Sequence, residues 1–414
     1  MFGQYARSFI AAVTVFAFSL PMAATAAQAA QNEVILIGAP MSFTGQHATN
    51  GKHSRKGYQL AVNFINENGG IDVSGKKYDL KVKYYDDESN PKLAAKFAKR
   101  LITKDNVQFM LGPYSTAITD AVADVTEKYR MPMVQANGAS LSLFEKDRIY
   151  MFAVLSSADQ YLIEALNLIA EQTTAAGGDT SSLTVAIAVE NDPFSADLRQ
   201  GVVNTADKFD MKVVIDEFLP RDFKDMTFIL DKVKEQKPDI LVVSGHEGGA
   251  ELATRQIKEQ KVDVPMLTMT HCEGADIHGM YGVYADYTVC ATQWSSDMPF
   301  NGKWFGSPHN YKKRFEAEYG YEPPYQAAES SAAVLVLVDA IQRAGSLDRE
   351  NVRDALNKTD METFFGWIRF DETGKNVAKP IVLRQLVKGR YLVVAPSGYA
   401  KHGVVYPRPK WSER

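Results

Sequence analysis

The chain has few cysteines and lacks the sequence signatures of the common enzyme classes. Only Cys272 and Cys290 occur among its 414 residues. It contains no GxxxxGK[ST] phosphate loop, no GxSxG nucleophile elbow, no HExxH zinc helix and no GxGxxG turn after an expected strand. These absences argue against the nucleotide-binding, serine hydrolase and zinc protease classes that carry such motifs. We therefore expect a binding protein that needs no cofactor, rather than an enzyme.

The chain also lacks a large excess of either charge and has few long apolar runs. The formal net charge is −4, and neither sign forms a block along the chain. This balance argues against a nucleic-acid partner. Beyond the first twenty or so residues, no stretch is both long and apolar enough to cross a bilayer.

The first 29 residues have the composition of a secretory signal peptide. Arg7 precedes an apolar run from Phe9 to Leu20, and the small residues that follow include an A-x-A cleavage pattern at 27–29. No cysteine follows the run, so a lipid anchor is not expected. The sequence predicts a protein that is exported to the periplasm through a cleaved signal and is a soluble monomer there. Export also exposes Cys272 and Cys290 to an oxidising compartment, where they form either a disulfide or two buried thiols.

Short apolar runs alternate with amphipathic segments, which is typical of parallel sheets covered by helices. Strands are expected at 33–41, 78–89, 107–113 and 131–140, with helices at 57–70, 91–105 and 118–129. After a pause the same rhythm returns, with strands at 183–190, 211–220, 238–245 and 264–270 and helices at 194–209 and 249–260. About 385 residues after the signal are more than one hydrophobic core usually supports. Two Rossmann-like lobes are therefore predicted.

The last third of the chain is expected to return to both lobes. Helices at 307–320, 325–345 and 351–359 would cover the first lobe, and strands within 381–394 would join the second. The predicted division is residues 32–154 plus 296–362 for the first lobe, 155–295 plus 363–396 for the second and 397–414 for a C-terminal tail. Several crossings between lobes predict a hinge and a ligand cleft between the lobes.

Polar residues gather where the expected strands end, which is where ligands bind in such sheets. Turn chemistry and helix capping explain any single loop equally well, but six such loops favour a binding site. The loops are 42–50, Tyr114-Ser115-Thr116, Asn137-Gly138-Ala139, 191–194 with Phe194, His246-Glu247, and His271-Cys272-Glu273. Hydroxyls and free N–H groups at the start of a helix would hold an anion.

The order and spacing of several segments resemble the periplasmic solute-binding proteins of branched-chain amino acid (leucine/isoleucine/valine) ABC transporters. The segments are "ILIGAPMSFTG", "GYQLAVNFINENGGI", "YYDDESNPKLAAKFAKRLI", "LGPYSTAITDAVADVTEKYRMPMVQANGAS" and "FFGWIRFDETGKN". The resemblance implies the type I periplasmic binding protein fold. It also implies capture of a small carboxylate-bearing solute by lobe closure, with an amino acid preferred, and delivery to an inner-membrane ABC permease.

The resemblance also implies roles for individual residues. It places the carboxylate on the hydroxyl of Thr116, next to Ser115, with Asn137 and Ala139 in the partner loop. The family's aromatic wall falls on Asn50, which departs from the pattern, and second-lobe aromatic contacts fall on Phe194 and His246. The acidic partner of the ligand ammonium falls within 270–273, where Glu273 fits best. The ten predicted ligand-binding residues are Asn50, Tyr114, Ser115, Thr116, Asn137, Ala139, Phe194, His246, His271 and Glu273.

Three alternatives stay open at this point. If Glu273 points away from the ligand, a carboxylate without an ammonium group, such as an aromatic acid, is favoured, because an unpaired buried ammonium is costly. An exported metal-dependent hydrolase would use zinc bound by His246, His271, Cys272 and Glu273, a set that chance explains better. A sensory receptor subunit would use the same two-lobed fold.

Overall fold

The computed structural model describes residues 1, 32–221 and 223–413. Apart from Met1, the predicted signal peptide therefore lies outside the described residues, and residues Glu33–Arg414 form one compact unit. Among the described residues, no helix combines the length and the apolarity that crossing a bilayer requires.

The first sheet has the strand order β2-β3-β1-β4-β5-β6. The strands are β1 (Glu33–Met41), β2 (Ile71–Val73), β3 (Lys76–Asp86), β4 (Phe109–Leu111), β5 (Met133–Gln135) and β6 (Met151–Ala153). All neighbours pair in parallel except β2, which forms a hairpin with β3. The central strand β1 is a continuous apolar run because helices cover both of its faces.

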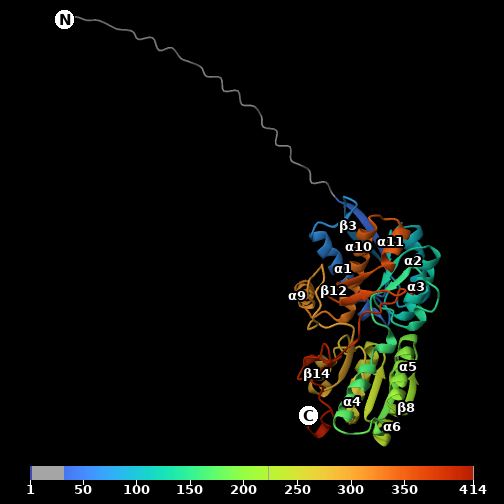
Figure 1. Cartoon of the computed structure of the whole chain (residues 1–414), viewed down its shortest axis with the longest axis vertical. Helices are drawn as coiled ribbons and strands as arrows, with labels where there is room; N and C mark the ends of the chain where they lie inside the picture. The colour runs from blue at the N-terminus through green and yellow to red at the C-terminus, as the bar shows by residue number, and fades with distance from the viewer. Residues whose placement is uncertain (2–31, 222, 414) are drawn as a thin grey trace. The chain divides into compact units, whose positions relative to one another are not determined.

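Helices from both ends of the chain cover this sheet, as Figure 1 shows. They are α1 (Ala48–Glu67), α2 (Pro91–Thr103), α3 (Thr116–Lys128), α9 (Pro308–Tyr319), α10 (Tyr325–Ala344) and α11 (Arg349–Asn357). The apolar side of α10 and that of α1 belong to one core with β1. Residues of α9, α10 and α11 thus pack in the core of the first sheet.

Helix α1 starts well before the expected position, and its glycines explain the difference. A Cβ at Gly51 would lie 1.8 Å from the Ser42 carbonyl oxygen, and one at Gly57 would lie 2.1 Å from that of Ala327. These glycines let α1 pack against backbone on both sides. In the sequence they resemble the glycines of a loop, so the expected helix begins nine residues too late.

The second sheet has the order β15-β14-β11-β10-β9-β7-β8. Its strands are β7 (Thr184–Glu190), β8 (Lys212–Leu219), β9 (Ile240–Ser244), β10 (Met266–Met269), β11 (Val289–Thr292), β14 (Val382–Val387) and β15 (Arg390–Ala395). Its helices are α4 (Ile163–Ala175), α5 (Pro193–Lys208), α6 (Thr227–Gln236), α7 (Glu247–Gln260) and α8 (Ile277–Tyr281). Figure 1 shows α4, α5 and α6 beside this sheet. Residues 382–387 and 390–395 thus supply two strands of the second sheet.

Short elements complete the fold. A hairpin forms from β12 (Asp360–Thr363) and β13 (Gly366–Arg369). The 3₁₀ helices are η1 (Leu141–Leu143), η2 (Ala158–Gln160), η3 (Thr180–Ser182), η4 (Gly282–Ala285) and η5 (Trp411–Glu413). Phe364, Phe365 and Ile368 pack in the core of the first sheet. The predicted boundaries of the two lobes stay a prediction.

Three crossings join the two sheets within the described residues, after β6, after β11 and after β13. The side chain of Gln293, which lies on the crossing after β11, bonds to the other two. Its Oε1 accepts from the Ser156 N–H at 3.1 Å and from Lys379 Nζ at 3.1 Å. Gln293 Nε2 donates to the Ser156 carbonyl at 3.0 Å, and Ser156 Oγ donates to the Lys379 carbonyl at 2.7 Å. The crossings therefore form one hydrogen-bonded group. The predicted two-lobed α/β fold is confirmed.

A disulfide links the two cysteines, with their Cα atoms 6.0 Å apart. Cys272 follows β10 and Cys290 lies in β11, so the bridge joins neighbouring strands. Of the two predicted states of the cysteines, the structure contains the disulfide.

Candidate functional site

The turn between β4 and α3 presents an unpartnered hydroxyl. Ser115 precedes the first residue of α3 with a φ of 74° and makes no side-chain cap to the helix. Its Oγ is buried and has no hydrogen-bond partner among the described residues. Thr116 Oγ1 accepts from the Ser140 N–H at 3.3 Å, which leaves its proton to donate. Both hydroxyls, together with the open N–H groups of the first helical turn, suit an anion.

The loop after β5 is held rigidly beside this turn. Gln135 Oε1 accepts from the N–H groups of Asn137 at 2.9 Å and Gly138 at 2.7 Å. The Asn137 side chain accepts from Ser54 Oγ at 3.0 Å, so α1 also fixes its position. Ala139 then lies at the wall of the same cavity as Ser115.

An aromatic group from both lobes closes over these loops. Tyr114 Oη lies 3.2 Å from His246 Nδ1 and 3.2 Å from His271 Nε2, although Tyr114 follows β4 and the histidines follow β9 and β10. Phe194, at the start of α5, packs with ring centroids 5.7 Å from His271 and 4.9 Å from Tyr161. The aromatic residues thus bridge the two lobes directly.

Only one of the three imidazoles in this region favours the charged form. Burial lowers the pKa of His246, but the hydrogen bond and charge of Asp192 outweigh burial and raise it to about 9. Its Nε2 lies 2.9 Å from Asp192 Oδ2. Burial first, then the charge on His246, lower the pKa of His47 to about 3 and that of His271 well below its ordinary range. At neutral pH His246 is therefore the charged imidazole of these three.

Most of the predicted residues meet at one cavity of about 20 Å³. Its lining includes Tyr114, Ser115, Thr116, Asn137, Ala139, Phe194, His246 and His271. The structure does not bring Asn50 or Glu273 to it. Asn50 lies in the first turn of α1 rather than in a loop, and its Nδ2 donates to Glu247 of the second lobe.

Glu273 lies at a different cavity, of about 690 Å³. It pairs there with the buried guanidinium of Arg384 from β14. The sequence offered no sign of this partner, because the two residues are far apart along the chain. The alternative zinc set is not formed either, since Cys272 is in the disulfide and Glu273 faces Arg384.

The sequence interpretation missed three polar residues that line the cavity, namely Tyr161, Tyr325 and Glu329. Burial raises the pKa of Glu329 well above its ordinary range. A carboxylate within the apolar run of α10 was the one signal that could have revealed it, since buried carboxylates usually have a function or a partner.

Comparisons with known proteins agree over most of the chain. A family described as "Periplasmic binding protein" matches residues 34–390. The leucine-, isoleucine-, valine-, threonine-, and alanine-binding protein of Pseudomonas aeruginosa is 22% identical over 351 residues, which cover 85% of this chain and 89% of that one. These matches run through both sheets.

Two solved structures show the same fold. The branched-chain amino acid transporter substrate-binding protein of Streptococcus pneumoniae, in complex with isoleucine, has a TM-score of 0.73 at 22% identity and covers 88% of this chain and 100% of its own. A solute-binding protein of Rhodopseudomonas palustris, in complex with 3,4-dihydroxybenzoic acid, has a TM-score of 0.73 at 19% identity and covers 92% and 99%.

Proposed function

Because the chain belongs to the periplasmic binding protein family, we propose that it captures a small carboxylate-bearing solute between its lobes and delivers it to an ABC permease. It acts as a binding protein and not as an enzyme, in the periplasm and as a monomer. The observation that carries this proposal is the Ser115 hydroxyl, which is buried, unpartnered and placed at the start of α3. A solute carboxylate would satisfy that hydroxyl and the helix N–H groups together.

The solute requires the lobes to separate before it can bind. The cavity of about 20 Å³ holds little more than a water molecule. Tyr114 bonds directly to His246 and His271, and Asp197 of α5 accepts from the Leu141 N–H at 2.7 Å. These contacts between lobes support an opening motion at the three crossings. Tyr114 would then separate from the two histidines, and the solute would bind in the space between them.

An amino acid is the preferred solute, and an aromatic acid is the second candidate. Glu329 lines the cavity, and the charge of an α-ammonium group beside it would favour the carboxylate form that burial alone disfavours. It would then take the role predicted for Glu273. The rings of Tyr114, Phe194 and Tyr325 line the same cavity and would suit a benzoate-like solute instead. Relatives solved with isoleucine and with 3,4-dihydroxybenzoic acid make both classes reasonable probes.

Thermal unfolding with a panel of amino acids and benzoic acids tests the proposal. A solute at 100 times its Kd should stabilise the protein by about 2.7 kcal/mol. Ser115→Ala should weaken that binding about 10- to 100-fold, because a hydrogen bond to a charged group contributes about 1.5–3 kcal/mol. Ser182→Ala, at an exposed position outside the cavity, is the matched control.

The same panel separates the two solute classes. Glu329→Gln should weaken the binding of an amino acid and leave the binding of an aromatic acid unchanged, since only the amino acid carries an ammonium group. Absence of stabilisation by every compound would contradict capture of carboxylates, and unchanged affinity in Ser115→Ala would contradict the assigned carboxylate position.

A further inference from the structure

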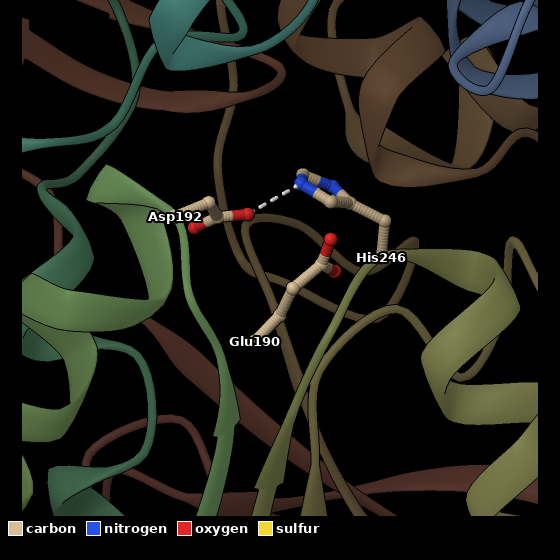
Figure 2. A group of neighbouring side chains, drawn as sticks. All are labelled: Glu190, Asp192 and His246. Carbon is tan, nitrogen blue, oxygen red and sulfur yellow. Dashed lines mark hydrogen bonds and ion pairs between the residues drawn. The ribbon is translucent and has the colours of Figure 1, made fainter. Parts of the chain in front are cut away.

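Three potential metal ligands meet at the carboxyl edge of the second sheet. Glu190 is the last residue of β7, Asp192 precedes α5, and His246 precedes α7. One ligand atom of each lies within 4.8 Å of those of the other two. Figure 2 shows the carboxylate of Glu190 and the imidazole of His246 directed toward the same space as Asp192.

The distances already approach those of a metal site. His246 Nε2 and Asp192 Oδ2 are 2.9 Å apart, and two ligands of a tetrahedral zinc ion lie about 3.3 Å apart when each bond is about 2.0–2.1 Å. A small rotation of Glu190 would bring in the third ligand. One imidazole nitrogen and two carboxylate oxygens suit zinc and its first-row neighbours.

A second observation points to the same space. His47 is 7% exposed, and its Nδ1 has no partner among the described residues. It lines two cavities, of about 30 and about 70 Å³, that Glu190 and His246 also line. Its ring centroid is 5.0 Å from that of His246. The proposed solute site gives no role to this buried nitrogen of His47. A neutral imidazole nitrogen is a common metal ligand.

We propose that Glu190, Asp192 and His246 bind one divalent transition-metal ion such as Zn²⁺, with His47 as a fourth ligand. The ion would replace the proton that His246 shares with Asp192, and that proton would be released to solvent. This proposal goes beyond the capture of a solute, because the ion would bind without one. The ion would also add positive charge next to Ser115, which lines the smaller of the two cavities with the ligands. Binding of the ion would then strengthen the hold on a carboxylate.

Two cationic side chains oppose the ion and provide a test of the charge argument. Arg221 and Lys224 line the same pair of cavities, one in each. Their charges compete with a metal for the carboxylates. Lys224→Met should therefore tighten metal binding, whereas loss of a ligand should weaken it.

Isothermal titration of the metal-free mature protein with ZnCl₂, in the absence of any solute, tests the site. We expect one ion per chain and no heat with MgCl₂. Glu190→Gln and Asp192→Asn should weaken zinc binding by about 100-fold or more, since loss of even an outer partner of a metal ligand costs about 10- to 100-fold. Asn at position 192 can still cap α5. Glu217→Gln, a carboxylate of β8 that pairs with Lys232, is the control and should bind zinc normally.

Absence of zinc binding, or equal binding by the wild type and both ligand variants, would overturn the proposal. Circular dichroism and the Tm of each metal-free variant show whether it is folded, so that misfolding is not mistaken for loss of a ligand. Solute binding measured in EDTA separates this result from the proposed function. A protein that binds its solute in EDTA and never binds zinc refutes only the metal site.

Discussion

The charge pair between His246 and Asp192 should make the stability of the protein depend on pH. The interaction raises the pKa of His246 from 6.5 to about 9, and it lowers the pKa of Asp192. A histidine whose pKa is raised on folding stabilises the folded state fully below pH 6.5. That contribution is lost as the pH rises through about 9.

The size of the effect follows from the same pKa. The increase from 6.5 to about 9 corresponds to about 3 kcal/mol at about 1.4 kcal/mol per pH unit. The two side chains are 17% and 11% exposed, so screening by solvent removes little of it. We expect about 2–3 kcal/mol of stability at pH 6 that is absent at pH 9.5.

The measurement is urea unfolding of the wild type and of Asp192→Asn from pH 6 to 9.5, with EDTA present to exclude metal ions. The wild-type curve alone is not diagnostic, because burial lowers the pKa of Lys379 to about 7. A lysine of that kind adds stability as the pH rises from 7 to 10.5, which offsets the loss from His246. The contribution of Lys379 is the same in both proteins, so it cancels in the difference between their free energies of unfolding. A difference that stays the same at pH 6 and pH 9.5 would refute a charged His246.

Three further predictions concern the fold. Gly57→Ala should lower the free energy of unfolding in chemical denaturation by several kcal/mol, on the order of the largest single-site effects, because its Cβ would lie 2.1 Å from a carbonyl oxygen of α10. Cys272→Ser should lower it by about 2–4 kcal/mol in nonreducing buffer, with no further loss on adding reductant. Arg384→Met should destabilise the protein by less than the ~3–5 kcal/mol of a fully buried pair, because it leaves the half-buried Glu273 unpaired. A double variant that also carries Glu273→Leu should recover most of that loss if Glu273 serves structure rather than a ligand.

The fold could be predicted because its local patterns repeat. Buried parallel strands are continuous apolar runs, amphipathic segments follow them, and strand ends of one sheet meet at one edge. That logic also brought Ser115, Asn137 and His246 to one cavity. This prediction requires only the order of the strands and helices along the chain and not the way in which they pack.

The remaining features depend on contacts that no local pattern contains. Glu329 reaches the cavity because α10 returns to the first sheet from far along the chain. Glu273 faces Arg384 because β14 pairs with β11 beside it. Asn50 lies in a helix whose glycines pack against backbone, so its loop-like composition was misleading.

The shared amide of Gln293 has a consequence for how tightly the protein holds its solute. If the lobes open as proposed, the measured Kd is the intrinsic Kd divided by the fraction of molecules in the binding-competent arrangement. Ser156, Gln293 and Lys379 help to set that fraction, since their hydrogen bonds join all three connections between lobes. Substitutions at the crossings can then change affinity, whereas the residues of the cavity determine which solute is bound. Two such proteins with the same cavity could therefore differ in the solute concentration at which half of the molecules are occupied.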